Sequence, residues 1–125
     1  MRIFKSTWFD RFANKVGITD EELREIVNLL ESGQADVDYG AGVYKMRIAR
    51  PGEGKSGGHR VIVLFRSKER TFFVYGFPKS AKANISKREL RMAKETAKEY
   101  FSLTTEQLEK RIKRGRFIEL QEHDK

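Results

Sequence analysis

The spacing of apolar residues changes twice along this 125-residue chain, and the change restricts the folds that it can adopt. From residue 7 to residue 33 the apolar residues recur at helical intervals, as on the buried face of a helix. From residue 42 to residue 77 they alternate or run without interruption, which is typical of strands. Helical spacing returns at residue 86. Helices and strands segregated in this way predict an α+β domain.

The starts of the predicted helices are marked by capping signals. A Ser or Thr followed three residues later by Glu or Gln can form a capping box, in which each residue satisfies a backbone N–H of the other. Such pairs occur at Thr19 and Glu22, at Ser86 and Glu89, and at Thr104 and Gln107. We therefore predict helices beginning near residues 7, 19, 86 and 104, and the first two are expected to form a hairpin.

Three consecutive segments, 42–49, 59–65 and 71–77, have strand patterns and short connections, which predicts an antiparallel meander. The middle segment is almost entirely apolar, as expected for a central strand covered on both faces. Residues 2–6 are compatible with an opening strand, and residues 117–120 with a short strand or a docked tail.

The length supports one hydrophobic core, so we expect a single domain over residues 1–125. Its predicted architecture is α+β, with an N-terminal helical hairpin packed on a mainly antiparallel sheet and further helices at the C-terminal end. We expect all these helices to pack on one face of the sheet.

Positive charge is concentrated in the middle of the chain. The net charge is +8, but residues 41–98 carry fifteen Lys or Arg against four Asp or Glu, whereas residues 1–40 carry five against eight and residues 99–125 six against six. Basic proteins are common, and solvated lysines need no ligand. A central segment this positive nevertheless favours a polyanionic partner.

Several classes of protein are disfavoured by composition. The chain has no cysteine and only two histidines, so a metal site or a resident cofactor is not expected. The first residues lack the apolar core of a signal peptide, and no apolar run approaches a membrane span. We expect a cytoplasmic protein with no membrane partner.

Cationic side chains are predicted to gather on the strands. Side chains alternate along a strand, so Lys45 and Arg47 share one face, opposite the apolar residues that face the core. Further cations on or beside the neighbouring strands are Lys55, Arg60, Lys79 and Lys82. A lone strand lysine is usually only solvated. The cluster favours a phosphate-binding site, because like charges packed across strands are destabilising unless an anion joins them.

Cleavage of RNA by its own 2′-hydroxyl is a reaction that such a cluster can perform, because the nucleophile belongs to the substrate. Neighbouring cations lower the pKa of a lysine, which allows it to act as a base. His59 is a further candidate acid or base. Tyr75 and Phe77 are candidates for stacking on bases, although core packing explains at least half of the aromatic residues in this strand.

The loop at residues 50–58 contains Gly54-Lys55-Ser56, which looks like the end of a phosphate-binding P-loop. The first glycine of that motif would fall at residue 49, which is alanine, and the next segment is predicted to be a strand rather than a helix. We therefore reject a nucleotide-hydrolysing P-loop. The glycines still permit a close approach to a nucleic-acid backbone.

Three segments taken together resemble the RelE/HigB-type toxins of bacterial type II toxin–antitoxin systems, particularly the HigB-like branch. They are Val43-Tyr-Lys-Met-Arg-Ile-Ala-Arg50, Gly54-Lys-Ser-Gly-Gly-His-Arg-Val-Ile62 and Phe73-Val-Tyr-Gly-Phe-Pro-Lys-Ser80. The resemblance covers about residues 40–100, and the preceding helical hairpin fits it. Residues 102–125 form a C-terminal extension beyond the minimal toxin.

The resemblance implies a microbial-RNase-like fold and endonucleolytic cleavage of mRNA in the ribosomal A site without a metal. It also implies neutralisation by a cognate antitoxin, expected to be a helix-turn-helix protein. By motif position, Lys45 matches the general base, Arg47 a second strand cation and Arg60 the arginine that stabilises the transition-state phosphate. Lys79 lies within one residue of the position of the general acid. Lys55, His59, Tyr75, Phe77 and Lys82 are the expected RNA-binding residues.

Two other functions remain open from the sequence. The same basic face would suit a non-catalytic RNA-binding domain, which would bind RNA with strong salt dependence and leave it intact. A relative of the same superfamily directed at DNA gyrase, of the ParE type, would leave RNA alone and disturb DNA replication instead.

Overall fold

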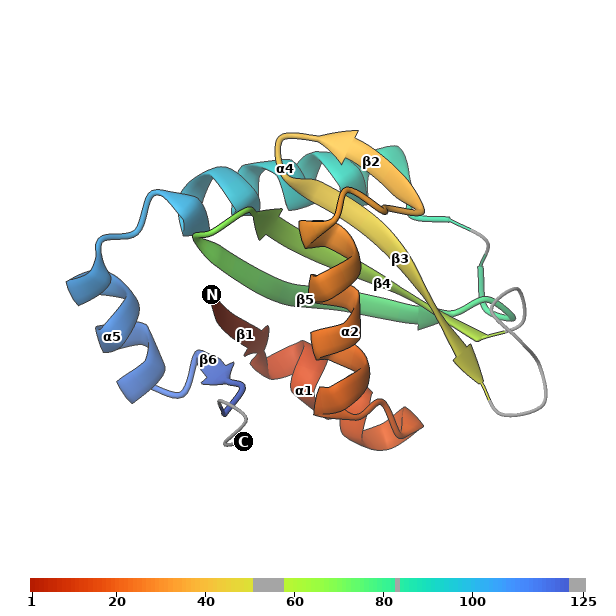
Figure 1. The fold of residues 1–125 in the computed structure, drawn as a ribbon, viewed down its shortest axis with the longest axis horizontal. Helices are drawn as coiled ribbons and strands as arrows, with labels where there is room; N and C mark the ends of the chain where they lie inside the picture. Colours follow the sequence, from red (N-terminus) through yellow and green to blue (C-terminus); the bar gives the residue numbers. More distant parts are fainter. Residues whose placement is uncertain (51–57, 83, 122–125) are drawn as a thin grey trace.

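The computed structural model describes residues 1–50, 58–82 and 84–121 (Figure 1). The elements follow in the order β1 (Arg2–Ser6), α1 (Thr7–Val16), α2 (Asp20–Glu31), β2 (Val37–Gly40), β3 (Val43–Arg50), β4 (Gly58–Arg66), β5 (Arg70–Pro78), α4 (Lys87–Phe101), α5 (Thr105–Lys113) and β6 (Phe117–Glu119). The predicted α+β class is confirmed. The helical hairpin is present, although it does not stand first as the label N-terminal implies: β1 precedes it, at the residues that were compatible with an opening strand.

The six strands described form one sheet with the order β2-β3-β4-β5-β1-β6. β3, β4 and β5 are antiparallel neighbours, which confirms the predicted meander. β1 pairs in parallel with β5, and β6 pairs antiparallel with β1. The two ends of the chain therefore form one side of the sheet, next to the meander.

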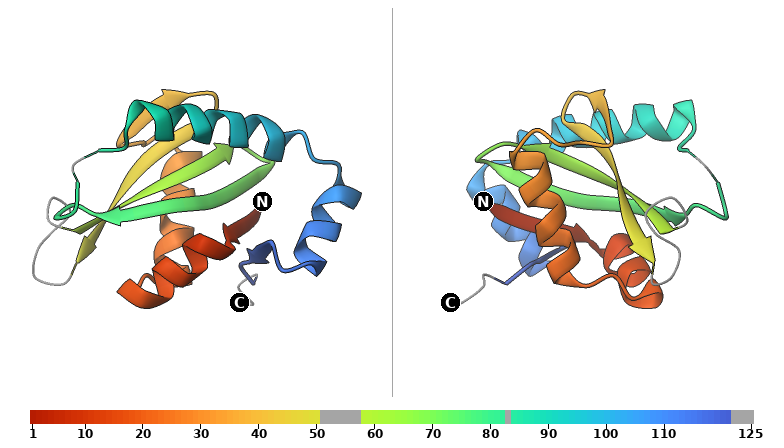
Figure 2. Two further views of the ribbon diagram at one scale, coloured as in Figure 1. Left: turned by 180° about the vertical axis from the view of Figure 1, so that it is seen from behind. Right: turned by 45° about the vertical axis from the view of Figure 1, so that its right-hand side comes forward.

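Helices cover both faces of this sheet, so the expectation of helices on one face was wrong. α2 crosses in front of the strands in Figure 1 and behind them in the left view of Figure 2, where α4 lies in front. One apolar cluster joins α1 and α2 to Met46, Val61 and Val63, and a second joins α4 and α5 to Ile62 and Leu64. The physical reason lies in β4, whose residues 58–65 are all buried and so need cover on both sides.

The three predicted capping boxes are present at the starts of α2, α4 and α5, each with both reciprocal hydrogen bonds. α1 begins differently, because the Ser6 side chain accepts a hydrogen bond from the Phe9 N–H. Gly17 ends α1 with a φ of 81°, a left-handed conformation that glycine adopts without strain.

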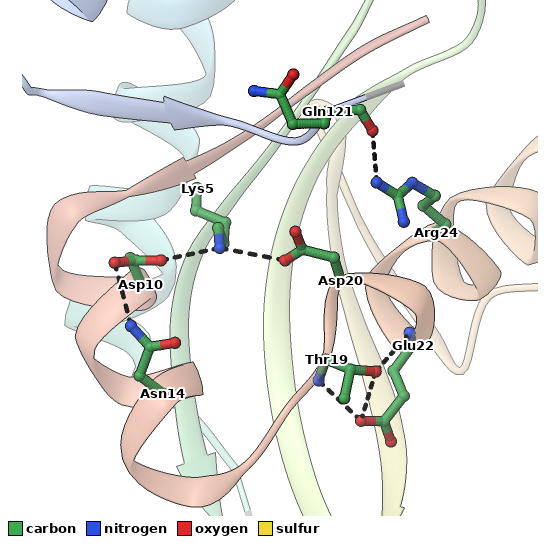
Figure 3. Close-up of polar contacts among 8 residues, drawn as sticks. All are labelled: Lys5, Asp10, Asn14, Thr19, Asp20, Glu22, Arg24 and Gln121. Atoms are coloured by element: carbon green, nitrogen blue, oxygen red, sulfur yellow. Dashed lines mark hydrogen bonds and ion pairs between the residues drawn. The ribbon is translucent and has the colours of Figure 1, made fainter. Parts of the chain in front are cut away.

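A buried lysine connects β1 to both helices of the hairpin (Figure 3). The Lys5 ammonium lies 2.8 Å from Asp10 on α1 and 3.2 Å from Asp20 at the start of α2. Burial lowers the pKa of Lys5, but these two bonds outweigh the burial and raise it overall. In the same view, Arg24 of α2 donates a hydrogen bond to the backbone carbonyl of Gln121, beyond β6.

Candidate active site

The register between β3 and β4 brings three cations together. Arg47 lies directly opposite Arg60, and Lys45 lies opposite Ile62, two residues along the same pair of strands. Because side chains alternate, all three cations project from the sheet face that Ile62 and Leu64 share with α4. We call Lys45, Arg47 and Arg60 the strand cations.

Each strand cation differs in its burial. Arg60 is only 6% exposed, Lys45 is half-buried, and Arg47 is exposed with 42% of its side chain accessible. The Arg47 guanidinium and backbone N–H both donate to the carboxylate of Asp36, at 3.1 and 2.8 Å. The site therefore contains one buried guanidinium group, that of Arg60, and one exposed group, that of Arg47.

Lys45 is positioned by the side-chain amide of Asn84, which lies in the segment before α4. Its ammonium donates to Asn84 Oδ1 at 3.2 Å, and the same oxygen accepts from the Tyr39 hydroxyl at 2.7 Å and from the Ile85 N–H at 3.1 Å. β2, β3 and the segment before α4 thus meet at one atom. This convergence fixes where the lysine amine lies.

The pKa of Lys45 is lowered from its ordinary value of 10.5. Desolvation by burial is the main cause, and the positive charge of Arg60 adds to it, as does that of Arg47, while Asp36 acts in the opposite direction. An amine of lowered pKa is unprotonated for a larger fraction of the time near neutral pH, which is the form that accepts a proton.

Two aromatic side chains, Tyr75 and Phe77, project beside the strand cations because β5 contains a bulge. Ile62 pairs with Tyr75 but Val63 pairs with Phe73, so Val74 is an extra residue. The extra residue shifts the alternation by one, so Tyr75 and Phe77 project on the face of the strand cations. Without it they would share the opposite face with Phe73.

Lys82 lies over both rings, its ammonium 5.1 Å from the centroid of Tyr75 and of Phe77. It also forms an ion pair of 2.8 Å with Glu89 in the first turn of α4. This ion pair and a hydrogen bond from the Ser86 backbone lower the pKa of Glu89 to about 2. Phe77 is only 4% exposed and packs in the core, whereas Tyr75 remains half-exposed, so of the two rings Tyr75 is the more accessible to a base.

Three further predicted residues are His59, Lys79 and Lys55. His59 projects on the opposite face from Arg60, where it is 4% exposed and its ring meets that of Phe12 edge-on at 5.8 Å, so the structure does not bring it together with the strand cations. Lys79 is exposed just after β5, and its backbone N–H donates to the Gly58 carbonyl at 3.1 Å. Lys55 lies outside the described residues.

A hollow of about 350 Å³ adjoins Tyr75 between α4 and the sheet, lined mainly by apolar side chains such as Ile62, Ile85 and Met92. In the described part of the chain, no group of three or more His, Asp or Glu side chains is arranged to hold a metal ion. None of the helices described there is long and apolar enough to cross a membrane.

Sequence reasoning missed three polar residues of this site, Asp36, Tyr39 and Asn84. They lie in or beside short segments with no periodic pattern. A signal for Asp36 was nevertheless available, since it is an acidic residue just before the most basic segment of the chain.

The arrangement combines groups that can hold an anion with others beside them: two guanidinium groups, an amine of lowered pKa and a half-exposed ring. Groups of this kind suit a polyanionic ligand. A family model described as the RelE toxin of the RelE/RelB toxin–antitoxin system matches residues 1–120. The chain belongs to the RelE toxin family, and so is the toxin component of a toxin–antitoxin system.

Proposed function

We propose that this RelE-family toxin is an endoribonuclease that cleaves translated mRNA in the ribosomal A site and so inhibits growth. The observation that carries the proposal is the lowered pKa of Lys45 beside Arg47 and Arg60 on one face of the sheet. Family membership supports an action on translation. The protein is proposed to act in the cytoplasm, where the ribosomes are. The proposed inhibitor is an antitoxin with a helix-turn-helix domain. The HigB-like branch remains our assignment.

In the proposed reaction Lys45, in its neutral form, accepts the proton of the RNA 2′-hydroxyl. The 2′-oxygen forms a bond to the adjacent phosphorus while the bond from phosphorus to the 5′-oxygen breaks, which leaves a 2′,3′-cyclic phosphate and a free 5′-hydroxyl. Arg47 and Arg60 offset the extra negative charge on the phosphate as it develops. Lys79, exposed just beyond β5, is the proposed donor of the proton that the leaving 5′-oxygen takes.

Tyr75 is the proposed stacking partner of a base next to the cleaved bond. Its ring is half-exposed beside the strand cations, and stacking on an aromatic side chain fixes an unpaired base without reading its sequence. No metal is assigned a role, because the nucleophile comes from the RNA and the strand cations supply the positive charge.

The test is primer extension on mRNA from cells that express the protein briefly. We expect new 5′ ends within translated regions for the wild type and their loss for Lys45→Gln. Arg47→Gln is expected to reduce them. A matched control is Lys98→Gln, which removes an exposed lysine from the last turn of α4 and is expected to cleave normally. Circular dichroism of each variant verifies the fold.

Other results would select another function. Intact mRNA together with arrested DNA replication would replace the proposal with a gyrase-directed toxin. Intact mRNA with normal growth, together with salt-dependent RNA binding by the purified protein, would replace it with a non-catalytic RNA-binding domain. Cleavage that persists in Lys45→Gln would refute the role of Lys45 as base.

A further inference from the structure

A second hollow, of about 460 Å³, lies between the start of α1 and the segment from α5 to β6. Three arginines line it, Arg111, Arg114 and Arg116, and the first turn of α1 contributes Thr7 and Trp8. None of the strand cations lines this hollow. We call it the arginine pocket.

Positive charge in the arginine pocket is only partly balanced. Glu99, the one acidic residue of the lining, forms an ion pair of 2.6 Å with Arg111. Within the described part of the chain, the guanidinium groups of Arg114 and Arg116 form no ion pair or hydrogen bond. A backbone hydrogen bond from Arg116 to the Arg111 carbonyl holds these residues around the same hollow. All three arginines line one hollow, so an anion bound there would offset their positive charge.

The start of α1 adds to this preference for an anion. The first turn of a helix is the positive end of its dipole, and here it forms part of the same lining as the arginines. Two features of the same lining, arginines without an ion pair and residues of the first turn of a helix, therefore favour the same ligand. Guanidinium groups bind phosphate well because two parallel N–H bonds match two of its oxygens.

The exposure of Trp8 indicates which kind of molecule the phosphate belongs to. Its side chain is 47% exposed, although tryptophan is the largest apolar side chain. Its ring lies 5.0 Å from that of Tyr75, which stands beside the strand cations. The hollow next to Tyr75 and the arginine pocket also share Ser6 and Tyr100 in their linings. Exposed rings alternating with cations are typical of surfaces that bind single-stranded nucleic acid.

We propose that the arginine pocket binds a backbone phosphate of the RNA strand whose scissile phosphate lies at the strand cations, with Trp8 stacking on a base between the two. The inference rests on the proposed function in taking RNA as the ligand, but it does not require cleavage. The pocket increases affinity and fixes the direction in which the strand crosses the protein.

The probe is a single-stranded oligonucleotide of about twelve residues, within the length that one small domain covers, with 2′-O-methyl groups that block cleavage. Binding is followed by the anisotropy of a dye on the oligonucleotide and by the fluorescence of Trp8, the only tryptophan of the chain. For the double variant Arg114→Gln/Arg116→Gln we expect affinity to fall about tenfold. The slope of log affinity against log salt should decrease by about 0.7 for each phosphate that the variant no longer binds.

The matched control is Lys110→Gln/Lys113→Gln, which also removes two positive charges from the end of α5 but none from the pocket. We expect it to bind with nearly the salt slope of the wild type. Equal losses in the two double variants would overturn the proposal, since general attraction would then explain the effect. Unchanged affinity in Arg114→Gln/Arg116→Gln would overturn it as well.

Lys45→Gln separates this proposal from that of cleavage. If the variant no longer cleaves mRNA but its Trp8 fluorescence still changes with the oligonucleotide, and the change disappears when Arg114 and Arg116 are also replaced, both proposals are supported. If the wild type binds through the arginine pocket but leaves mRNA intact, the pocket stands and the cleavage proposal fails. If mRNA is cleaved and the pocket variants bind normally, only the pocket is refuted.

Discussion

At the scale of single residues, the environment of Lys45 determines what its amine can do. Arg60, buried in the same face, and Arg47 next to it both favour the neutral amine, whereas Asp36 favours the charged form. Asp36 is also held by Arg47, through two hydrogen bonds. The burial of the amine, which is the main cause of its lowered pKa, and the balance of these charges together set the pH at which the proposed base is active.

Two variants are expected to move the pH dependence of cleavage in opposite directions. Arg47→Gln removes a positive charge that lowers the pKa of Lys45, so the pKa rises and the rate reaches its plateau at a higher pH. Asp36→Asn removes a negative charge that raises it, so the plateau is reached at a lower pH. At pH 7 we also expect Arg47→Gln to be about tenfold slower, because a charged hydrogen bond to phosphate is removed.

The measurement is single-turnover cleavage of a short mRNA on purified ribosomes over a range of pH. Lys98→Gln, far along α4, serves as the control and should follow the wild-type profile. Shifts of the same sign in both variants would contradict the charge balance around Lys45 and would point to a different titrating group.

Which residues of the site were predictable depended on how local their pattern is. Alternation along one strand placed Lys45 and Arg47 together, and the meander placed Arg60 beside them. The same alternation places His59 and Arg60 on opposite faces, but the continuous apolar run of β4 conceals which face is which. Asn84 meets Lys45 through a long-range contact, for which a single sequence carries no signal, and Asp36 is marked only by its acidic side chain just before the most basic segment.

At the scale of elements, β5 depends on a glycine that allows a ring to approach the strand. A Cβ built at Gly76 would lie 2.4 Å from Cε2 of Phe12, which is far inside contact distance. Phe12 belongs to α1 and stacks on Trp8, with the ring centroids 5.6 Å apart. The close approach of α1 to β5 therefore requires glycine at this position.

We expect Gly76→Ala to lower the free energy of unfolding by about 1–3 kcal/mol, the usual cost of overpacking, because Phe12 must move. Urea denaturation measures the change. In a Phe12→Ala background the same substitution should cost less, since the ring that it meets is absent. An equal cost in both backgrounds would show that the loss arises from the strand itself and not from the contact with α1.

The start of α4 supplies a prediction about acid stability. Glu89 pairs with Lys82 and closes the capping box with Ser86, and its pKa is lowered from 4.5 to about 2. A carboxylate with a lowered pKa stabilises the fold above about pH 4.5, and this contribution is lost as the pH falls toward 2.

Glu89→Gln keeps a capping residue but removes the charge. We expect it to lower the free energy of unfolding by up to about 1 kcal/mol at pH 7, because the pair lies near the surface. The difference from the wild type should vanish as both are taken toward pH 2. Unfolding by urea at several values of pH tests this, and a difference that stays constant down to pH 2 would contradict the role of the charge.

Helix starts were the most predictable elements, because a capping box is complete within four residues. β2 was missed, since it has only four residues and ends at a glycine. The parallel pairing of β1 with β5 brings together residues about 68 positions apart, such as Arg2 and Arg70, and no local pattern encodes such a contact. The bulge at Val74, which turns Tyr75 toward the strand cations, has no sequence signal either.

At the scale of the whole molecule, the distribution of charge in space differs from that along the chain. Residues 99–125 carry equal numbers of acidic and basic side chains, and for that reason gave no indication of a binding surface. In the fold, Glu109 and Glu119 turn to Arg2, and Arg114 and Arg116 line the arginine pocket. Part of a neutral segment thus presents a positive surface, because Glu109 and Glu119 pair with Arg2 outside the segment.

The C-terminal part of the chain is also joined to the core, through Phe117 of β6. This side chain is 3% exposed, and its ring centroid lies within 6 Å of those of Phe4, Phe72 and Tyr100, at 5.9, 5.2 and 5.0 Å. It therefore connects β6 to β1, to β5 and to the end of α4, and it directly follows Arg116 of the arginine pocket.

We expect Phe117→Ala to lower the free energy of unfolding by about 3–5 kcal/mol, because it leaves a cavity among three other rings. That is a large part of the total stability of a small domain, so the whole fold should melt earlier in one transition. Ile118→Ala, next along the strand and half-buried, is the control, with an expected loss of about 1–2 kcal/mol. Thermal and urea unfolding would measure both. If Phe117→Ala instead lost less than the control and RNA binding persisted, β6 would be an appendage to the sheet, and the arginine pocket would not depend on the core.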